Sequence, residues 1–136
     1  MMRVVLDTNV LLSGILWKGL PGNIIDHWKE GLFHLVVTDE IFAEYQAVLG
    51  RFAGDNEIEI EIDEMIQIVG ERAFWCAEVK LTEAVCRDQD DDKFVAAALG
   101  GNARFIVSGD KALLEVGSFG GVEILTARQF LSKLRS

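Results

Sequence analysis

The sequence predicts one α/β domain over residues 1–136, built as a three-layer α/β/α sandwich around a central, mostly parallel sheet of about five strands. Short apolar runs alternate with longer segments in which apolar residues recur at helical spacing, as in parallel strands joined by helical crossovers. Half of the 136 residues are hydrophobic, one is proline, and no repeat or linker interrupts the alternation. A chain of this size and composition can bury a single core.

The first part of the chain alternates clearly between the two patterns. Strands are indicated by short, β-branched apolar runs, and helices by apolar residues three or four positions apart. Thr38 is a favoured helix N-cap and Gly31 is typical of helix C-termini. The elements expected here are a strand at 2–6, a helix at 10–17, a helix from Pro21 to Gly31, a strand at 34–37 and a helix at 40–52.

The middle of the chain is ambiguous. Residues 57–62 alternate between Glu and Ile, which fits a strand, but the isoleucines also share one helical face with later apolar residues. Both interpretations of residues 57–62 stay open, and a helix is expected at 63–74. The weaker apolar run at 76–80 predicts a further strand.

The last part of the chain repeats the first pattern. Gly100 and Gly101 follow an apolar run that is rich in alanine, as expected at the end of a helix. The expected elements are a helix at 93–99, a strand at 104–107, a helix at 111–115, a strand at 122–125 and a helix at 127–134.

Charge and composition narrow the classes of function. The formal net charge of −9 argues against a protein that holds nucleic acid by general electrostatics. It leaves open an enzyme whose carboxylates hold metal ions, because bound cations reverse the local charge. No apolar run reaches the length of a membrane span, no signal peptide is recognised, and the two cysteines lack metal-ligand spacing. A cytoplasmic protein is therefore expected.

Four carboxylates are expected at one edge of the sheet. Asp7 follows the first strand, Asp110 follows the strand at 104–107, Asp92 begins a helix, and Glu44 lies one to two turns into the helix after the second strand. The carboxyl ends of parallel strands meet at the same edge, where ligands bind. Carboxylates gathered there would repel one another unless a hard cation such as Mg²⁺ binds them, and two such ions can hydrolyse a phosphodiester. A plain capping role for the residues after the first strand is the simpler alternative.

Four motifs, in this order, resemble those of PIN-domain ribonucleases, and most of all the VapC-like toxins of toxin–antitoxin systems. They are the strand that ends in Asp7-Thr8-Asn9, the segment 38–49 with its internal Glu44, the run Asp92-Lys93-Phe94-Val95-Ala96-Ala97-Ala98, and the segment 106–110. Together they cover essentially the whole chain.

This resemblance implies a function, a set of site residues and partners. It implies Mg²⁺- or Mn²⁺-dependent cleavage of RNA by a homodimer that a small antitoxin inhibits. The acidic quartet would be Asp7, Glu44, Asp92 and Asp110, with Ser108 as the small hydroxyl residue of the last motif. Thr8, Asn9 and Asp91 are supporting candidates from their own positions, because they stand next to Asp7 or Asp92 in the chain. Lys93 and Lys111 are candidates for contacts with RNA phosphates, and the apolar first helix, with Trp17 and Trp28, is a candidate dimer face.

The position of the third acid stays open on the residues themselves. Asp92 and Asp91 each share a helical face with apolar residues of the following helix, so helical phase does not separate them. The resemblance favours Asp92, with Asp90 and Asp91 as N-cap and first-turn charge.

Two other classes of function remain. One is a Mg²⁺-dependent phosphatase or receiver-like domain that uses Asp7 as nucleophile, although such phosphatases usually carry a second Asp two residues later, where this chain has Asn9. The other is a catalytically silent binding module, for which Glu44 would point to solvent, far from Asp7.

Overall fold

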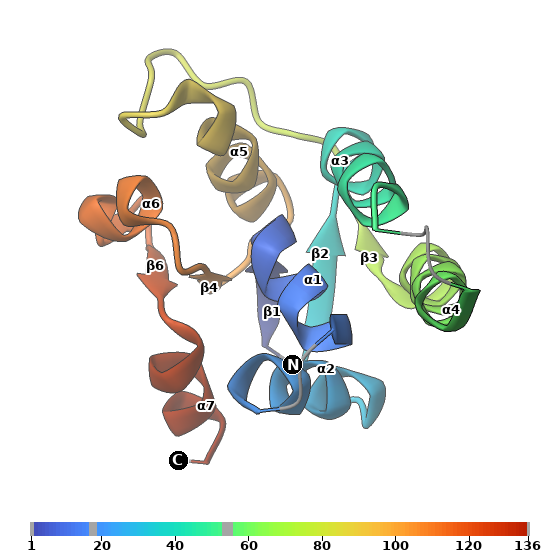
Figure 1. The fold of residues 1–136 in the computed structure, drawn as a ribbon. Helices are drawn as coiled ribbons and strands as arrows, with labels where there is room; N and C mark the ends of the chain where they lie inside the picture. Colours follow the sequence, from blue (N-terminus) through green and yellow to red (C-terminus); the bar gives the residue numbers. More distant parts are fainter. Residues whose placement is uncertain (1, 17–18, 53–55, 136) are drawn as a thin grey trace.

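The computed structural model describes residues 2–16, 19–52 and 56–135, which form one six-stranded sheet flanked by helices (Figure 1). The strand order is β3-β2-β1-β4-β6-β5. Neighbouring strands pair in parallel except for β5 and β6, which are antiparallel. The strands are β1 (Arg3–Leu6), β2 (His34–Val37), β3 (Phe74–Trp75), β4 (Phe105–Val107), β5 (Ser118–Phe119) and β6 (Val122–Leu125). This confirms the predicted α/β class with a mostly parallel sheet.

Seven α-helices and one 3₁₀ helix lie among the described residues. They are α1 (Thr8–Leu16), α2 (Leu20–Lys29), α3 (Asp39–Gly50), α4 (Asn56–Arg72), η1 (Gln89–Asp91), α5 (Asp92–Gly100), α6 (Lys111–Val116) and α7 (Ala127–Arg135). Helix α5 packs on four strands of the sheet, whereas α1 packs on α2, α3 and α4. Apart from α4 and β3, the bounds agree with the predicted elements to within one or two residues.

The register of the two central strands brings the first and last motifs together. Leu6 at the end of β1 is the pairing partner of Val107 at the end of β4. Residues 4–6 of β1 and all of β4 are fully buried, as their apolar sequences require for a sheet covered on both faces. Asp7 and Ser108, the residues that follow, therefore leave the sheet side by side.

The segment at 57–62 is helical, and α4 begins before it. Ile62, Met65 and Val69 lie on the inner face of this helix and are at most 5% exposed. The helical spacing of these apolar residues decides the structure, because a strand would have turned only every second one inward. The side chain of Glu57 lies outside the described residues.

The predicted strand at 76–80 is wrong, and so is the extension of the preceding helix to Phe74. Phe74 and Trp75 form β3, paired with Val36 and Val37 of β2. The chain then leaves the sheet for α5, where the Val79 N–H donates to the Ala96 carbonyl at 3.3 Å. Gly100 permits this approach, since a Cβ there would lie 2.1 Å from the Ala77 carbonyl oxygen.

The antiparallel strand β5 is a second departure from the prediction. Gly120 and Gly121, with φ of 58° and 85°, form the two-residue turn between β5 and β6. Positive φ at both positions is the geometry of a type I′ hairpin turn. The Gly-Gly pair is a sequence signal for this hairpin.

Trp28 does not form part of an exposed dimer face with the first helix, as the sequence had suggested it would. This side chain is 2% exposed and belongs to the core, so it offers no surface to a partner. Trp17 lies outside the described residues. None of the helices in the described ranges is both long and apolar enough to span a membrane.

Candidate active site

Asp7 lies at the carboxyl end of β1 and is 6% exposed. The Ser108 hydroxyl donates to its Oδ2 at 2.6 Å, and the Asn9 backbone N–H approaches its Oδ1 at 3.4 Å. Burial raises the pKa of Asp7, while the hydrogen bonds from Ser108 and Asn9 oppose the shift. The predicted support from Ser108 is therefore a direct contact, whereas Asn9 acts through its backbone and leaves its side chain exposed.

Asp110 is the N-cap of α6 and is held by hydrogen bonds to its neighbours. Its backbone N–H donates to the Ser108 hydroxyl oxygen at 2.9 Å, and its Oδ1 accepts from the Ala112 N–H at 3.2 Å. The adjacent Asp91 carboxyl, the Ala112 N–H and Arg87 lower the pKa of Asp110. Ser108 thus connects Asp7 to the first turn of α6.

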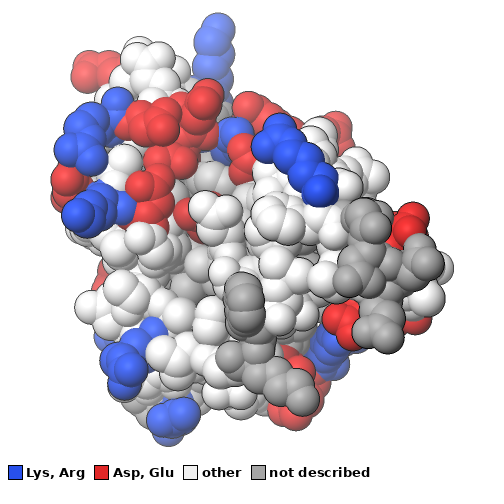
Figure 2. Space-filling model, in the orientation of Figure 1, with Lys and Arg blue, Asp and Glu red and all other residues white. Residues whose placement is uncertain are grey.

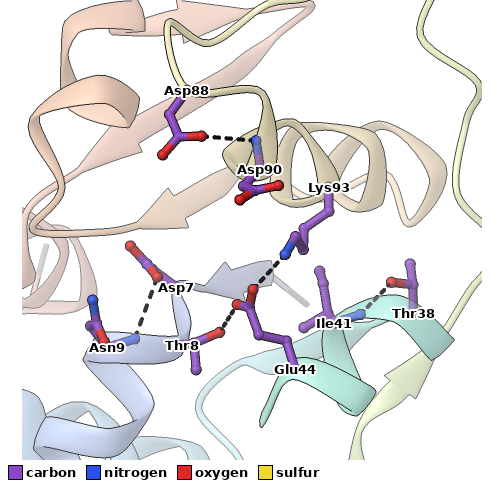
Figure 3. Close-up of polar contacts among 9 residues, drawn as sticks. All are labelled: Asp7, Thr8, Asn9, Thr38, Ile41, Glu44, Asp88, Asp90 and Lys93. Atoms are coloured by element: carbon purple, nitrogen blue, oxygen red, sulfur yellow. Dashed lines mark hydrogen bonds and ion pairs between the residues drawn. The ribbon is translucent and has the colours of Figure 1, made fainter. Parts of the chain in front are cut away.

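Glu44 points toward Thr8, the residue after Asp7, and its side chain is partly buried. Its carboxylate lies between α1 and α5: the Thr8 hydroxyl donates to Oε2, and the Lys93 ammonium contacts Oε1 (Figure 3). Helix α3 carries Glu44 to this position because Thr38 caps the helix by accepting from the Ile41 N–H at 3.2 Å. The silent-module alternative required a solvated Glu44 far from Asp7, which this geometry does not fit.

Tyr45 is a supporting residue that the sequence pattern assigned only to the apolar stripe of its helix. Its hydroxyl donates to the Leu6 carbonyl at 2.6 Å and is fully buried. This bond joins α3 to the end of β1, directly before Asp7. The sequence signal for this contact was a tyrosine on the apolar stripe next to Glu44, because the hydroxyl of a buried tyrosine must find a hydrogen-bond partner.

The three consecutive acids have three different surroundings. Asp90 lies in η1, whose N-cap Asp88 accepts from the Asp90 N–H at 3.0 Å (Figure 3). Asp92 accepts from the backbone N–H groups of Val85 and Cys86, at 3.1 Å and 2.7 Å. Its carboxylate therefore holds the segment that precedes η1.

Asp91, in contrast, faces the other acids of the edge. Its Oδ2 is buried and has no hydrogen-bond partner in the described structure. Burial and the neighbouring Asp110 carboxylate raise the pKa of Asp91 to about 7, and the charge of Asp7 adds to this. Asp91 thus belongs with Asp7 and Asp110, and we call these three the Asp7–Asp91–Asp110 group.

Lys93 and Lys111 differ sharply in exposure. Lys93 is 13% exposed at its side chain and is paired with Glu44, so it is not a free contact for RNA in this structure. Lys111 is exposed at the first position of α6. Figure 2 shows acidic side chains gathered on the upper part of one face, with Lys and Arg side chains at its rim.

Cysteine chemistry is not available at this edge. Cys86 is 4% exposed and carries a free thiol, as does Cys76. Burial and the adjacent Asp92 raise the pKa of Cys86 to about 12. The thiol stays protonated near neutral pH, and both cysteines remain packing residues.

A groove of about 560 Å³ lies beside the acidic edge. It runs between Glu40, the segment 78–84 and Lys93 of α5. Burial and the nearby Glu40 raise the pKa of Glu78 in this groove. Its lining is more acidic than basic, so its charge does not favour phosphate.

Whether this edge of the sheet can bind a metal ion depends on which of its carboxylates are not already engaged by other groups. Among residues 2–16, 19–52 and 56–135, no group of three or more His, Cys, Asp or Glu side chains is already gathered to hold a metal ion. The donor chemistry nevertheless fits a hard cation, because Asp7 is buried with a raised pKa and Asp91 keeps an unpartnered buried oxygen.

Comparison with known proteins shows the family and the fold of the chain. Residues 3–112 match the family model described as PIN domain. An uncharacterised protein of Methanocaldococcus jannaschii, MJ1680, is 29% identical over 124 residues, which are 84% of this chain and 74% of that protein. The crystal structure of PAE2754 from Pyrobaculum aerophilum superposes with a TM-score of 0.66 at 14% identity, over 98% of this chain and 90% of that one, which shows the shared fold.

Proposed function

This chain belongs to the PIN-domain family, and from that premise we propose that it is a divalent-metal-dependent ribonuclease that hydrolyses phosphodiester bonds at the acidic edge of its sheet. The observation that carries the proposal is the juxtaposition of Asp7, Asp91 and Asp110 beside Glu44. The nuclease-type fold of the family supports the reaction class. The alternative of a phosphatase with Asp7 as nucleophile is less well supported, because Asp7 is 6% exposed and accepts a hydrogen bond from Ser108.

We assign the third acidic position to Asp91 in place of Asp92. Asp91 faces Asp7 and Asp110, whereas both oxygens of Asp92 accept from backbone N–H groups of the preceding segment. Asp92 would then act by holding that segment, and Asp91 by binding the cation. The sequence prediction that Asp92 is a ligand is replaced by this proposal.

Each residue of the site has its own role in the proposed reaction. Mg²⁺ or Mn²⁺, when bound, would neutralise the carboxylates, activate water and stabilise charge on the phosphate. Asp7 is oriented by Ser108, and Ser108 also fixes the backbone of Asp110. Lys111, exposed next to Asp110, is the candidate contact for RNA phosphates that enter the site. Arg87 is also exposed, but its guanidinium is paired with Glu115 at 3.3 Å.

A cleavage assay with purified protein tests this function. Single-stranded and hairpin RNA, and DNA of matched sequence, would be incubated with Mg²⁺ or Mn²⁺, with chelator, and with chelator followed by excess metal. We expect metal-dependent cleavage of RNA that chelator abolishes and added metal restores, and that Asp7→Asn lacks. Cleavage that resists chelator, or that Asp7→Asn retains, would contradict the proposal.

The toxin role, the antitoxin and the homodimer stay predictions. Neither the family match nor the named relatives bear on them. The gene directly upstream gives the simplest test of the pair: a small, basic, helix-rich product that blocks cleavage when co-purified would support it.

A further inference from the structure

Glu44 and Lys93 divide the acidic edge into two parts of different chemistry. We propose that Lys93 is a built-in counter-ion that takes the place of a second metal ion beside Glu44. The protein then binds one divalent cation, through the Asp7–Asp91–Asp110 group, and Glu44 is a positioning residue instead of a ligand. This inference rests on the proposed function, which requires the cation.

The contacts of Glu44 carry the first step. Lys93 Nζ contacts one carboxylate oxygen and the Thr8 hydroxyl donates to the other (Figure 3). A metal ion that bound Glu44 directly would have to compete with both donors. The side chains of Lys93 and Glu44 are 13% and 28% exposed, so water screens their attraction less than at the surface.

The distribution of charge carries the second step. The carboxylates whose charge acts on Lys93 come from every element around it: Glu40 and Glu44 on α3, Asp90 on η1, and Glu78 after β3. Lys93 supplies a cation to this side of the edge. Within the described residues, neither Asp7 nor Asp91 forms an ion pair with Lys or Arg.

The Asp7–Asp91–Asp110 group and the Glu44–Lys93 pair therefore differ in whether a carboxylate oxygen is left without a partner. The Asp7–Asp91–Asp110 group contains a buried, unpartnered oxygen on Asp91, which a hard cation would satisfy. Glu44 contains none, because both its oxygens are engaged. Removing Lys93 would leave the Glu44 carboxylate partly buried without its counter-charge, and a cation from solution would then be favoured there.

The test is the number of metal ions that each variant binds. Full-length protein would be titrated with Mn²⁺, by calorimetry and by the paramagnetic resonance of the ion. Wild type should bind about one Mn²⁺ per chain, and Lys93→Met about two. Lys93→Arg keeps the cation and should again bind about one.

Two further variants separate the roles of the acids. Glu44→Gln should raise the Kd for Mn²⁺ by less than about 10-fold, while Asp7→Asn should raise it by more than about 100-fold. The double variant Glu44→Gln/Lys93→Met replaces the ion pair by an uncharged pair of similar size. It should bind about one Mn²⁺ with a Kd near that of wild type. If Lys93→Met alone does not fold, this double variant replaces it in the test.

The outcomes separate this inference from the proposed function. Two ions bound to wild type, one ion bound to folded Lys93→Met, or a Glu44→Gln defect as large as that of Asp7→Asn would overturn the inference and leave a metal-dependent nuclease. Wild type that binds no Mn²⁺ at millimolar concentration would overturn the proposed function as well.

Discussion

The Asp7–Asp91–Asp110 group and the Glu44–Lys93 pair lie at the same edge of one sheet, yet they solve the same electrostatic problem differently. In the group, the pKa of Asp91 rises to about 7 because burial and Asp110 disfavour its charge. In the pair, burial lowers the pKa of Lys93, but hydrogen bonding to Glu44 and the charge of that carboxylate outweigh this and leave it raised. Acids near one sheet edge therefore need not share one role: Glu44 has a lysine partner, whereas neither Asp7 nor Asp91 has one among the described residues.

The largest effect is expected when Asp91 and Asp92 are replaced by Asn, one at a time. Asp91→Asn removes a carboxylate that faces Asp7, and Asn coordinates a hard cation poorly, so we expect cleavage to fall by more than about 100-fold. The rate under saturating RNA and the Kd for Mn²⁺ measure this effect.

Asp92→Asn is the matched control, because it changes the neighbouring acid in the same way. It should keep Mn²⁺ binding and instead lower the free energy of unfolding by about 1–2 kcal/mol, since two backbone N–H groups lose a charged acceptor. An inactive, metal-free Asp92→Asn beside an active Asp91→Asn would return the third position to Asp92.

The stability of the metal-free protein should depend on pH through Asp91, without any substitution. The pKa of Asp91 is about 7 in the folded protein and near 3.8 when unfolded, so folding favours its protonated form. The stability that this gives is fully present below about pH 4 and is lost as the pH rises through about 7. In the presence of chelator, the thermal midpoint of unfolding should therefore decrease as the pH is raised from about 5.5 to about 8.

Two controls assign this pH dependence to the group. Saturating Mn²⁺ should remove most of the loss, and Asp91→Asn should reduce it. Asp7 and Glu78 also have raised pKa values, so Asp91→Asn need not abolish it. A metal-free midpoint that rises over this range would contradict the assigned state of Asp91.

Tyr45→Phe should have the smallest effect and tests how the two regions are held together. It removes the hydroxyl that donates to the Leu6 carbonyl and keeps the ring. We expect a loss of about 1 kcal/mol in the free energy of unfolding, measured by chemical denaturation, and an unchanged Mn²⁺ stoichiometry. A change in the number of bound ions would mean that the spacing of α3 and β1 decides which acids bind.

Much of the fold was predictable because its signals are local. The apolar runs of β1, β2, β4 and β6 are separated by helices with clear caps, such as Thr38. The strand at Phe74–Trp75 was not predictable from such signals, because two residues carry no periodicity. The path of the chain after Trp75 depends on the close approach of Ala77 to Gly100, which is a tertiary contact.

The candidate site was predictable as a place but not in its details. The charges of Asp110 and Glu44 both act on Asp7 at the expected edge of the sheet, and the roles of these acids as ligands stay a proposal. Helical phase could not separate Asp91 from Asp92, because Gln89–Asp91 is a 3₁₀ turn, whose side chains do not follow the spacing of the α-helix that continues from Asp92. The pairing of Lys93 with Glu44 joins residues 49 positions apart, a distance at which sequence spacing carries no information.

The segment after β3 also limits how the chain can vary in length. It is tied to α5 at one end by the Val79–Ala96 hydrogen bond and at the other by Asp92, which holds Val85 and Cys86. Between these ties, Thr82, Glu83 and Ala84 are exposed. Added or deleted residues are absorbed at such positions at low cost, so relatives of different length, or an inserted epitope tag, can differ here while the Asp7–Asp91–Asp110 group keeps its geometry.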